Sequence, residues 1–230
     1  MTRLDMASIF ALVLGASAGC AMPARETGEA SPRARVEQTA DPFANAAREA
    51  YDELNDDFEE LVTDNARLDG ERAEAWREAR EEILEVRQQL GADLERLPAA
   101  SRDNSNDIRS RVTRNLETMT HRVERAKLLW ADGGRDFVSA ARQSLAEVDR
   151  EIESLQSDAR RLPMEAREDA SRAVEDLRRQ RNDVEEVVTS MADAAPQEIE
   201  EQRVEVADDV AELSASVQRE GFELRAELDN

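Results

Sequence analysis

Residues 145–163, LAEVDREIESLQSDARRLP, decide the fold class of this chain. Their apolar side chains recur at alternating steps of three and four, at Leu145, Val148, Ile152, Leu155, Ala159 and Leu162. This heptad spacing places the apolar side chains on one face of an α-helix and leaves the charged residues between them on the other faces. A helix with so narrow an apolar face needs helical partners, so the stretch predicts a coiled coil or a helical bundle.

Prolines divide the rest of the chain into segments with the same pattern. Asp41 and Pro42 predict a helix start, because Asp is a favoured N-cap and Pro suits the first helical position. Pro98 interrupts the next apolar stripe, and Pro163 and Pro196 are each expected to open a further helix. The boundaries predict helices of roughly 30 residues, about 45 Å long.

Glycines mark two further boundaries. Asp132-Gly133-Gly134 predicts the clearest turn in the chain, and Asp136 is expected to cap the helix that follows. Asp69-Gly70 leaves open whether the helix from residue 42 ends there or passes through.

All the remaining segments show the same helical spacing of apolar residues. No stretch alternates convincingly between apolar and polar residues with the period of two that a strand requires. The stripes comprise Phe43, Ala47, Tyr51, Leu54, Phe58, Leu61 and Leu68; Trp76, Ala79, Ile83, Val86, Leu90, Leu94 and Leu97; Ile108, Val112, Leu116, Met119, Val123, Ala126 and Trp130; Ala170, Val174, Leu177, Val184, Val188 and Met191; and Val206, Val210, Leu213, Val217, Leu224 and Leu228. We therefore predict an all-α domain over residues 41–230, with no sheet and with long amphipathic helices forming antiparallel hairpins or an extended bundle or coiled coil.

A weak internal repeat supports the hairpin as the unit. Arg96-Leu97-Pro98 and Arg161-Leu162-Pro163 lie 65 residues apart, and at the same offset Ile83 matches Val148, Leu90 matches Leu155, Asp93 matches Asp158 and Arg102 matches Arg167. Several hairpins packed as a bundle, or a dimer, would bury more apolar surface than one hairpin. Two long helices unbroken by the prolines are the competing arrangement.

The charge balance excludes some classes of partner. The chain has 53 acidic and 31 basic side chains, for a net charge of −22. Binding a nucleic-acid backbone or anionic lipid headgroups needs clustered positive charge, so no nucleic-acid partner is expected.

The sequence gives little support for catalysis or metal binding. His121 is the only histidine and falls off its apolar stripe, which is typical of a solvated surface residue. The single cysteine leaves no Cys–His pair and no thiolate cluster. Carboxylates at Glu201, Glu205, Asp208, Asp209 and Glu212 form the best cation candidate, but a solvated acidic face explains them more simply. We expect no enzyme activity, no cofactor and no metal site.

The first residues have the order of a secretory signal. Arg3 is followed by an apolar run over residues 7–14, then by small residues and by Cys20. The apolar run is shorter than the roughly 20 residues that a transmembrane helix needs. Ordinary secretion, with cleavage after Ala16 or Ala18, is the alternative to cleavage directly before Cys20.

Ser17-Ala18-Gly19-Cys20 resembles the lipobox of bacterial lipoproteins. In that family the cysteine thiol receives a diacylglycerol, the preceding peptide is removed, and the new amino end is often acylated. The resemblance implies a signal peptide over residues 1–19 and lipidation of Cys20. It departs at Ser17, where Leu, Val or Ile is usual, and at Asp5 in the charged region.

The lipobox resemblance also implies a location. Residues 21–40 lack an apolar period and predict a flexible linker, so the lipidated cysteine and linker together span residues 20–40. Ala21 follows the cysteine in place of the Asp that retains such lipoproteins in the inner membrane. The family's sorting habit thus implies an outer-membrane anchor facing the periplasm.

These features predict a lipid-anchored, non-enzymatic scaffold, spacer or partner-binding protein of the cell envelope, which associates with itself or with an envelope protein. The anchor and coiled coil are similar to the murein-linked lipoprotein. However, Leu228-Asp229-Asn230 lacks that family's linking lysine, so no covalent link to peptidoglycan is expected. The alternative is lipid binding by amphipathic helices, as in the exchangeable apolipoproteins.

Overall fold

The computed structural model describes residues 41–68, 70–131 and 133–228. In these residues every long regular element is an α-helix, and no strand occurs. The helices are α1 (Pro42–Asp64), α2 (Gly70–Arg96), α3 (Arg102–Leu129), α4 (Gly133–Ala159), α5 (Met164–Met191) and α6 (Pro196–Leu228). Single 3₁₀ turns, η1 (Asn65–Arg67) and η2 (Leu97–Ala99), follow α1 and α2. The all-α prediction is confirmed.

The helix boundaries follow local chemistry. The Asp41 side chain accepts a hydrogen bond from the Phe43 amide over 3.1 Å, so Asp41 caps α1 as predicted. Pro196 opens α6, and Pro163 immediately precedes α5, as expected. Pro98 lies in η2, between α2 and α3. These breaks show that the arrangement with two long unbroken helices is wrong.

Two details of the boundaries needed the structure. The first helix does not pass through Gly70: α1 ends at Asp64, and α2 begins at Gly70, whose φ is +57°. The cap expected at Asp136 is wrong, because α4 already begins at Gly133. Asp136 lies inside the first turn, where its negative charge faces the helix dipole.

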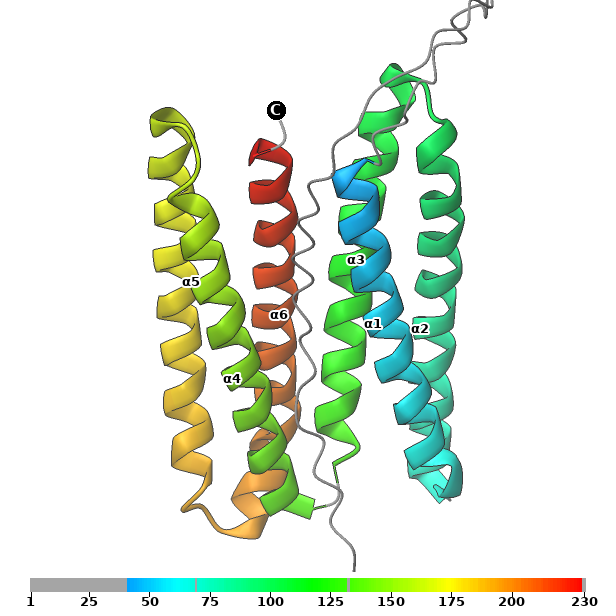
Figure 1. The fold of residues 1–230 in the computed structure, drawn as a ribbon. Coiled ribbons are helices and arrows are strands. Elements are labelled where there is room, and N and C mark those ends of the chain that lie inside the picture. The colour runs from blue at the N-terminus through cyan, green and yellow to red at the C-terminus, as the bar shows by residue number, and fades with distance from the viewer. Residues whose placement is uncertain (1–40, 69, 132, 229–230) are drawn as a thin grey trace, which may run out of the picture. The chain divides into compact units, whose positions relative to one another are not determined.

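Successive helices run in opposite directions, as an up-and-down bundle (Figure 1). The buried side chains form two clusters. One is built from α1, α2 and α3 and includes Phe222 of α6, and the other is built from α4, α5 and α6 and includes Leu128 of α3. The body is therefore two three-helix halves, α1–α3 and α4–α6.

The halves meet chiefly along α3 and α6, which pack against each other in antiparallel fashion (Figure 1). Ion pairs of Arg125 with Asp208 and of Glu117 with Arg219 join the two helices along their length. This pair makes the broadest contact in the bundle.

The predicted repeat corresponds to hairpins in the structure. The sequence offset of 65 residues aligns α2 and α3 with α4 and α5. The matched residues Ile83 and Val148 are both buried. Asp93 is buried and accepts two hydrogen bonds from Arg111, at 3.0 and 2.9 Å, which tie α2 to α3. Asp158 instead pairs with the nearby Arg161. The matched hairpins do not coincide with the two halves, since α2–α3 lies within one half and α4–α5 begins the other.

Candidate functional site

The sequence-predicted lipidation site, Cys20, lies outside the described residues. The same is true of the rest of residues 1–40, which hold the signal peptide and the linker, and of residues 229–230. The candidate sites in the described part of the chain are two grooves in the helical bundle.

The predicted cation candidate on α6 is divided by the structure. Asp208 forms an ion pair with Arg125 of α3, whereas Asp209 and Glu212 line a groove formed by α3, α5 and α6. Glu201 and Glu205 are exposed and line neither groove. Among the described residues no group of three His, Cys, Asp or Glu side chains is placed to hold a metal ion.

The first groove, here called the α1–α4 groove, is strongly acidic and has a volume of about 740 Å³. It contains Glu53, Asp57, Glu60 and Asp64 of α1, Lys127 and Leu128 of α3, and Ala140, Gln143, Ser144, Glu147, Arg150, Glu151 and Ser154 of α4, with Leu61 at its α1 side. The α1 carboxylates recur at steps of three and four, so one helical face supplies them all.

A polar network lies on the α3 side of this groove. Lys127 donates hydrogen bonds to Asp57 of α1 over 2.6 Å and to Glu124 of α3 over 2.7 Å. Ser144 of α4 donates to the second oxygen of Glu124 over 3.1 Å. Burial alone would lower the pKa of Lys127, but Glu124 and Asp57 outweigh it and raise that pKa. The network joins α1, α3 and α4, so it links the two halves.

Among the carboxyl groups of this groove, Glu151 has the most strongly shifted pKa. The residue keeps exposed surface, but its carboxyl group faces the other acidic side chains. Burial in the groove, reinforced by Glu53, Glu124 and Glu147, raises the pKa of Glu151 to about 7. The residues that line the groove therefore carry negative charge that is only partly compensated. The amount of this charge changes near neutral pH, as Glu151 titrates.

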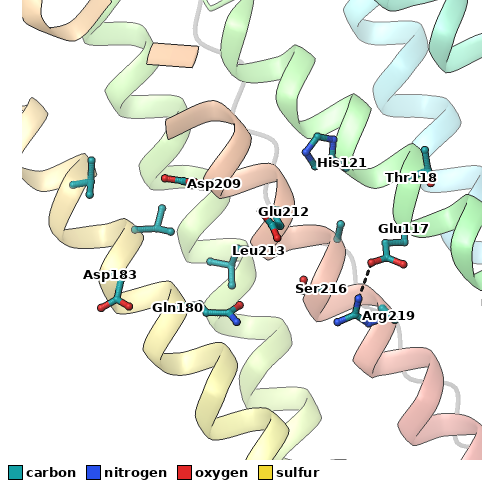
Figure 2. A pocket seen from close by; sticks show the side chains of 13 residues that line it. Glu117, Thr118, His121, Gln180, Asp183, Asp209, Glu212, Leu213, Ser216 and Arg219 are labelled. Carbon is teal, nitrogen blue, oxygen red and sulfur yellow. Dashed lines mark hydrogen bonds and ion pairs between the residues drawn. The ribbon is translucent and has the colours of Figure 1, made fainter. Parts of the chain in front are cut away.

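The second groove, here called the α5 groove, has a volume of about 760 Å³ and lies between α3, α5 and α6 (Figure 2). It is lined by Glu117, Thr118 and His121 of α3, Gln180, Asp183, Val184 and Val187 of α5, and Asp209, Glu212, Leu213, Ala215, Ser216 and Arg219 of α6. Its apolar part is Leu213, Ala215, Val184 and Val187, and polar side chains surround it. His121 lines this groove and is half-buried.

The charges of the α5 groove are unevenly paired. Arg219 pairs with Glu117 over 2.8 Å, which spans α6 and α3 (Figure 2). In the described part of the chain, no cation forms an ion pair with Asp183, Asp209 or Glu212. Burial and the neighbouring Glu205, Glu212 and Asp208 raise the pKa of Asp209.

The two faces of α6 thus differ in chemistry. Asp209, Glu212, Ser216 and Arg219 are spaced at three and four and face the α5 groove. Residues lining the smaller pockets beside the α1–α4 groove, Ser214, Gln218, Gly221 and Arg225, have the same spacing on the opposite side of the helix. One helix therefore contributes to both surfaces.

Sequence reasoning missed these grooves for an identifiable reason. Lys127 is the only lysine of the chain, which could have attracted attention, but nothing in the sequence pairs it with Asp57, 70 residues away. Val187 falls between the α5 stripe positions Val184 and Val188. An apolar residue beside a stripe is the one signal that could have indicated a wider apolar face.

Comparison with known proteins finds no match: no protein-family model, no characterised protein and no solved structure is similar to this chain. The residues themselves therefore carry the functional argument.

Proposed function

We propose that this chain is a lipid-anchored, non-enzymatic protein of the bacterial cell envelope whose helical body binds a partner or acts as a scaffold or spacer. Cys20 would carry the lipid, and residues 21–40 would separate the helical body from the membrane. In bacterial lipoproteins the residue after the lipidated cysteine directs sorting, and Ala21 at this position favours the outer membrane, facing the periplasm.

One observation supports a protein partner over direct lipid binding by the helices. The heptad residues pack into the two closed cores, and the large hydrophobic side chains that stay exposed in the described residues are only Leu84, Met164, Val187 and Val204. Lipid binding of the apolipoprotein kind requires amphipathic helices to turn their apolar faces to a bilayer. This body would have to lose its core packing first.

No helix of the described residues is both long enough and apolar enough to cross a bilayer. In the proposal the membrane attachment is the lipid on Cys20, and two or more acyl chains supply stable anchoring at ~0.8 kcal/mol per buried methylene.

The anchor is tested by palmitate labelling and membrane fractionation of the wild type and Cys20→Ala in a bacterium that processes lipoproteins. We expect the wild type to be labelled and membrane-bound, and the variant to be unlabelled and released by osmotic shock. If both the wild type and the variant are unlabelled and soluble, the chain is not a lipoprotein. An Ala21→Asp variant tests the sorting step, and we expect it to move the labelled protein to the inner membrane.

The role of the body is tested with the purified Cys20→Ala chain. Circular dichroism with and without liposomes should show the same helix content, because the bundle is already formed. A large gain of helix in the presence of liposomes would favour the apolipoprotein-like alternative.

A further inference from the structure

We propose that the α5 groove binds a basic amphipathic helix of a partner protein, with the partner's apolar face on Val184 and Val187 and its basic residues against Asp183, Asp209 and Glu212. This inference rests on the partner-binding role proposed above and names the class of partner.

The shape of the groove matches a helix. Helices α3 and α5 both pack against α6, and all three helices line this surface (Figure 2). The lining residues of α6 extend from Asp209 to Arg219, which corresponds to about 15 Å of helix axis. About three turns of a partner helix would fit along this length.

The apolar contacts lie where one face of such a helix would rest. The apolar floor of the groove consists of Val184, which is half-buried, and Val187, which is 38% exposed, with the buried Leu213 beneath them. Helices that bind in grooves present anchors at steps of three and four along one face. The exposed surface of Val187 is the part of the floor that the bundle itself does not cover.

Charge complementarity identifies the partner's other face. Three carboxylates at the groove, Asp183, Asp209 and Glu212, have no ion-pair partner within the described residues. Burial, with the neighbouring Glu205, Glu212 and Asp208, raises the pKa of Asp209, and an approaching cation would offset both effects. Lys and Arg side chains have the length to reach the carboxylates from a helix lying on the apolar floor.

The same charges make other occupants unfavourable. Anionic lipid headgroups and nucleic acid would be repelled by the uncompensated carboxylates. A second copy of the chain carries the same net charge of −22, which opposes self-association through an acidic surface. A basic helix from a different protein fits both the floor and the charge.

The test uses a dansyl-labelled 14-residue peptide of Leu and Lys with the leucines at helical three-and-four spacing, titrated with the purified full chain carrying Cys20→Ala at about 0.15 M salt. We expect Asp209→Asn/Glu212→Gln to weaken binding about tenfold. The matched control Glu168→Gln/Glu186→Gln removes the same charge from exposed positions of α5 outside the groove and should change the affinity less than twofold.

A second pair of variants tests the apolar floor. Val187→Ser should weaken binding about threefold, whereas Leu84→Ser, at an equally exposed position on α2, should have no effect. Equal weakening by both charge variants would mean that the peptide responds only to net charge, and would overturn the proposal. Equal effects of the two serine variants would do the same. A peptide of Leu and Glu with the same spacing should not bind, and liposome binding that depends on Val187 would identify a membrane as the occupant instead.

This outcome is independent of the lipid anchor. Palmitate labelling can fail while the peptide still binds in the groove, and labelling can succeed while the groove variants have no effect. The two proposals can therefore be rejected separately.

Discussion

Lys127 and Glu124 form an ion pair on α3 in which Nζ lies 2.7 Å from Oε1. Glu124 is only 8% exposed, and its other oxygen accepts a hydrogen bond from Ser144 of α4. We expect Lys127→Met to lower the free energy of unfolding by about 3 kcal/mol, because a buried carboxylate then loses its counter-charge. Urea unfolding at pH 7 measures this change.

The double variant Lys127→Met/Glu124→Gln provides the control. It removes both charges, and we expect it to regain much of the stability lost in the single variant, since a neutral amide is less costly to bury than a lone charge. A single variant as stable as the wild type would mean that the carboxylate is solvated and that the network does not link the halves.

The raised pKa of Glu151 predicts a pH-dependent stability. Because the pKa in the folded state, about 7, lies above the ordinary value of 4.5, folding favours the protonated form. The contribution of this group is fully present below about pH 4.5 and is lost as the pH rises through 7. Glu151→Gln should therefore stabilise the protein at pH 8, and should have little effect at pH 5.

The gain at pH 8 should be no more than about 1 kcal/mol, because the residue keeps exposed surface and solvent screens its charge. Thermal unfolding at both pH values measures it. Glu153→Gln, at an exposed position on the same helix, is the control and should show no such pH dependence. A variant that is equally stabilised at pH 5 and pH 8 would exclude titration of Glu151 as the cause.

The helices and most of the core could be predicted from the sequence, because local rules determine them. Proline and glycine positions gave the breaks, and the stripe from Ile108 to Ala126 is buried throughout α3. What local rules do not contain is which helices pack together. The pairing of α3 with α6 joins segments far apart in the chain, and the apolar stripe of each helix shows which face is buried but not which helix covers it.

The polar contacts between helices were the least predictable part. Charged residues make up 37% of the chain, so each cation has many possible carboxylate partners and the sequence does not choose among them. Arg203 shows this clearly. It forms an ion pair with Glu200 on α6 over 3.4 Å, and its buried guanidinium also donates hydrogen bonds to backbone carbonyls at the end of α3.

The backbone conformation of Gly133, at the junction of the two halves, predicts that replacing this glycine destabilises the protein. Its φ is +83°, a conformation that side chains with a Cβ disfavour, and an added Cβ would meet nothing within 4 Å. Gly133→Ala should therefore destabilise the protein by about 1 kcal/mol through backbone strain alone. Asn tolerates positive φ better, so Gly133→Asn should be less destabilised than the alanine variant in urea unfolding. The reverse order would mean that strain is not the cause.

The contacts of Arg203 predict a large loss of stability when its guanidinium group is removed. It is 8% exposed, donates to the carbonyls of Leu128, Leu129 and Ala131 at 3.1, 2.7 and 2.5 Å, and lies over the Phe137 ring. Arg203→Met removes the side-chain donor from all three carbonyls, of which Leu128 keeps a backbone donor, the Ala131 amide at 3.3 Å. We expect a loss of about 3 kcal/mol in the free energy of unfolding.

Arg203→Lys separates charge from geometry at the same position. An ammonium group cannot reproduce the planar guanidinium contacts, so we expect it to recover less than half of the loss, measured by urea unfolding. Full recovery by lysine would show that positive charge at the end of α3 is sufficient.

The position of Phe222 predicts that the α1–α3 half needs a side chain of α6 for its stability, and that each half loses protection separately. It belongs to α6 but is buried in the core of α1–α3, with its ring 5.9 Å from Phe43 in an edge-to-face arrangement. Phe222→Ala should lower the free energy of unfolding by about 3 kcal/mol, because it leaves a cavity in that core. Hydrogen exchange should then show a larger loss of protection in α1 than in α5, which lies in the other half. Phe137→Ala, in the core of α4–α6, should give the opposite distribution, and identical exchange patterns for the two variants would mean that the halves unfold as one unit.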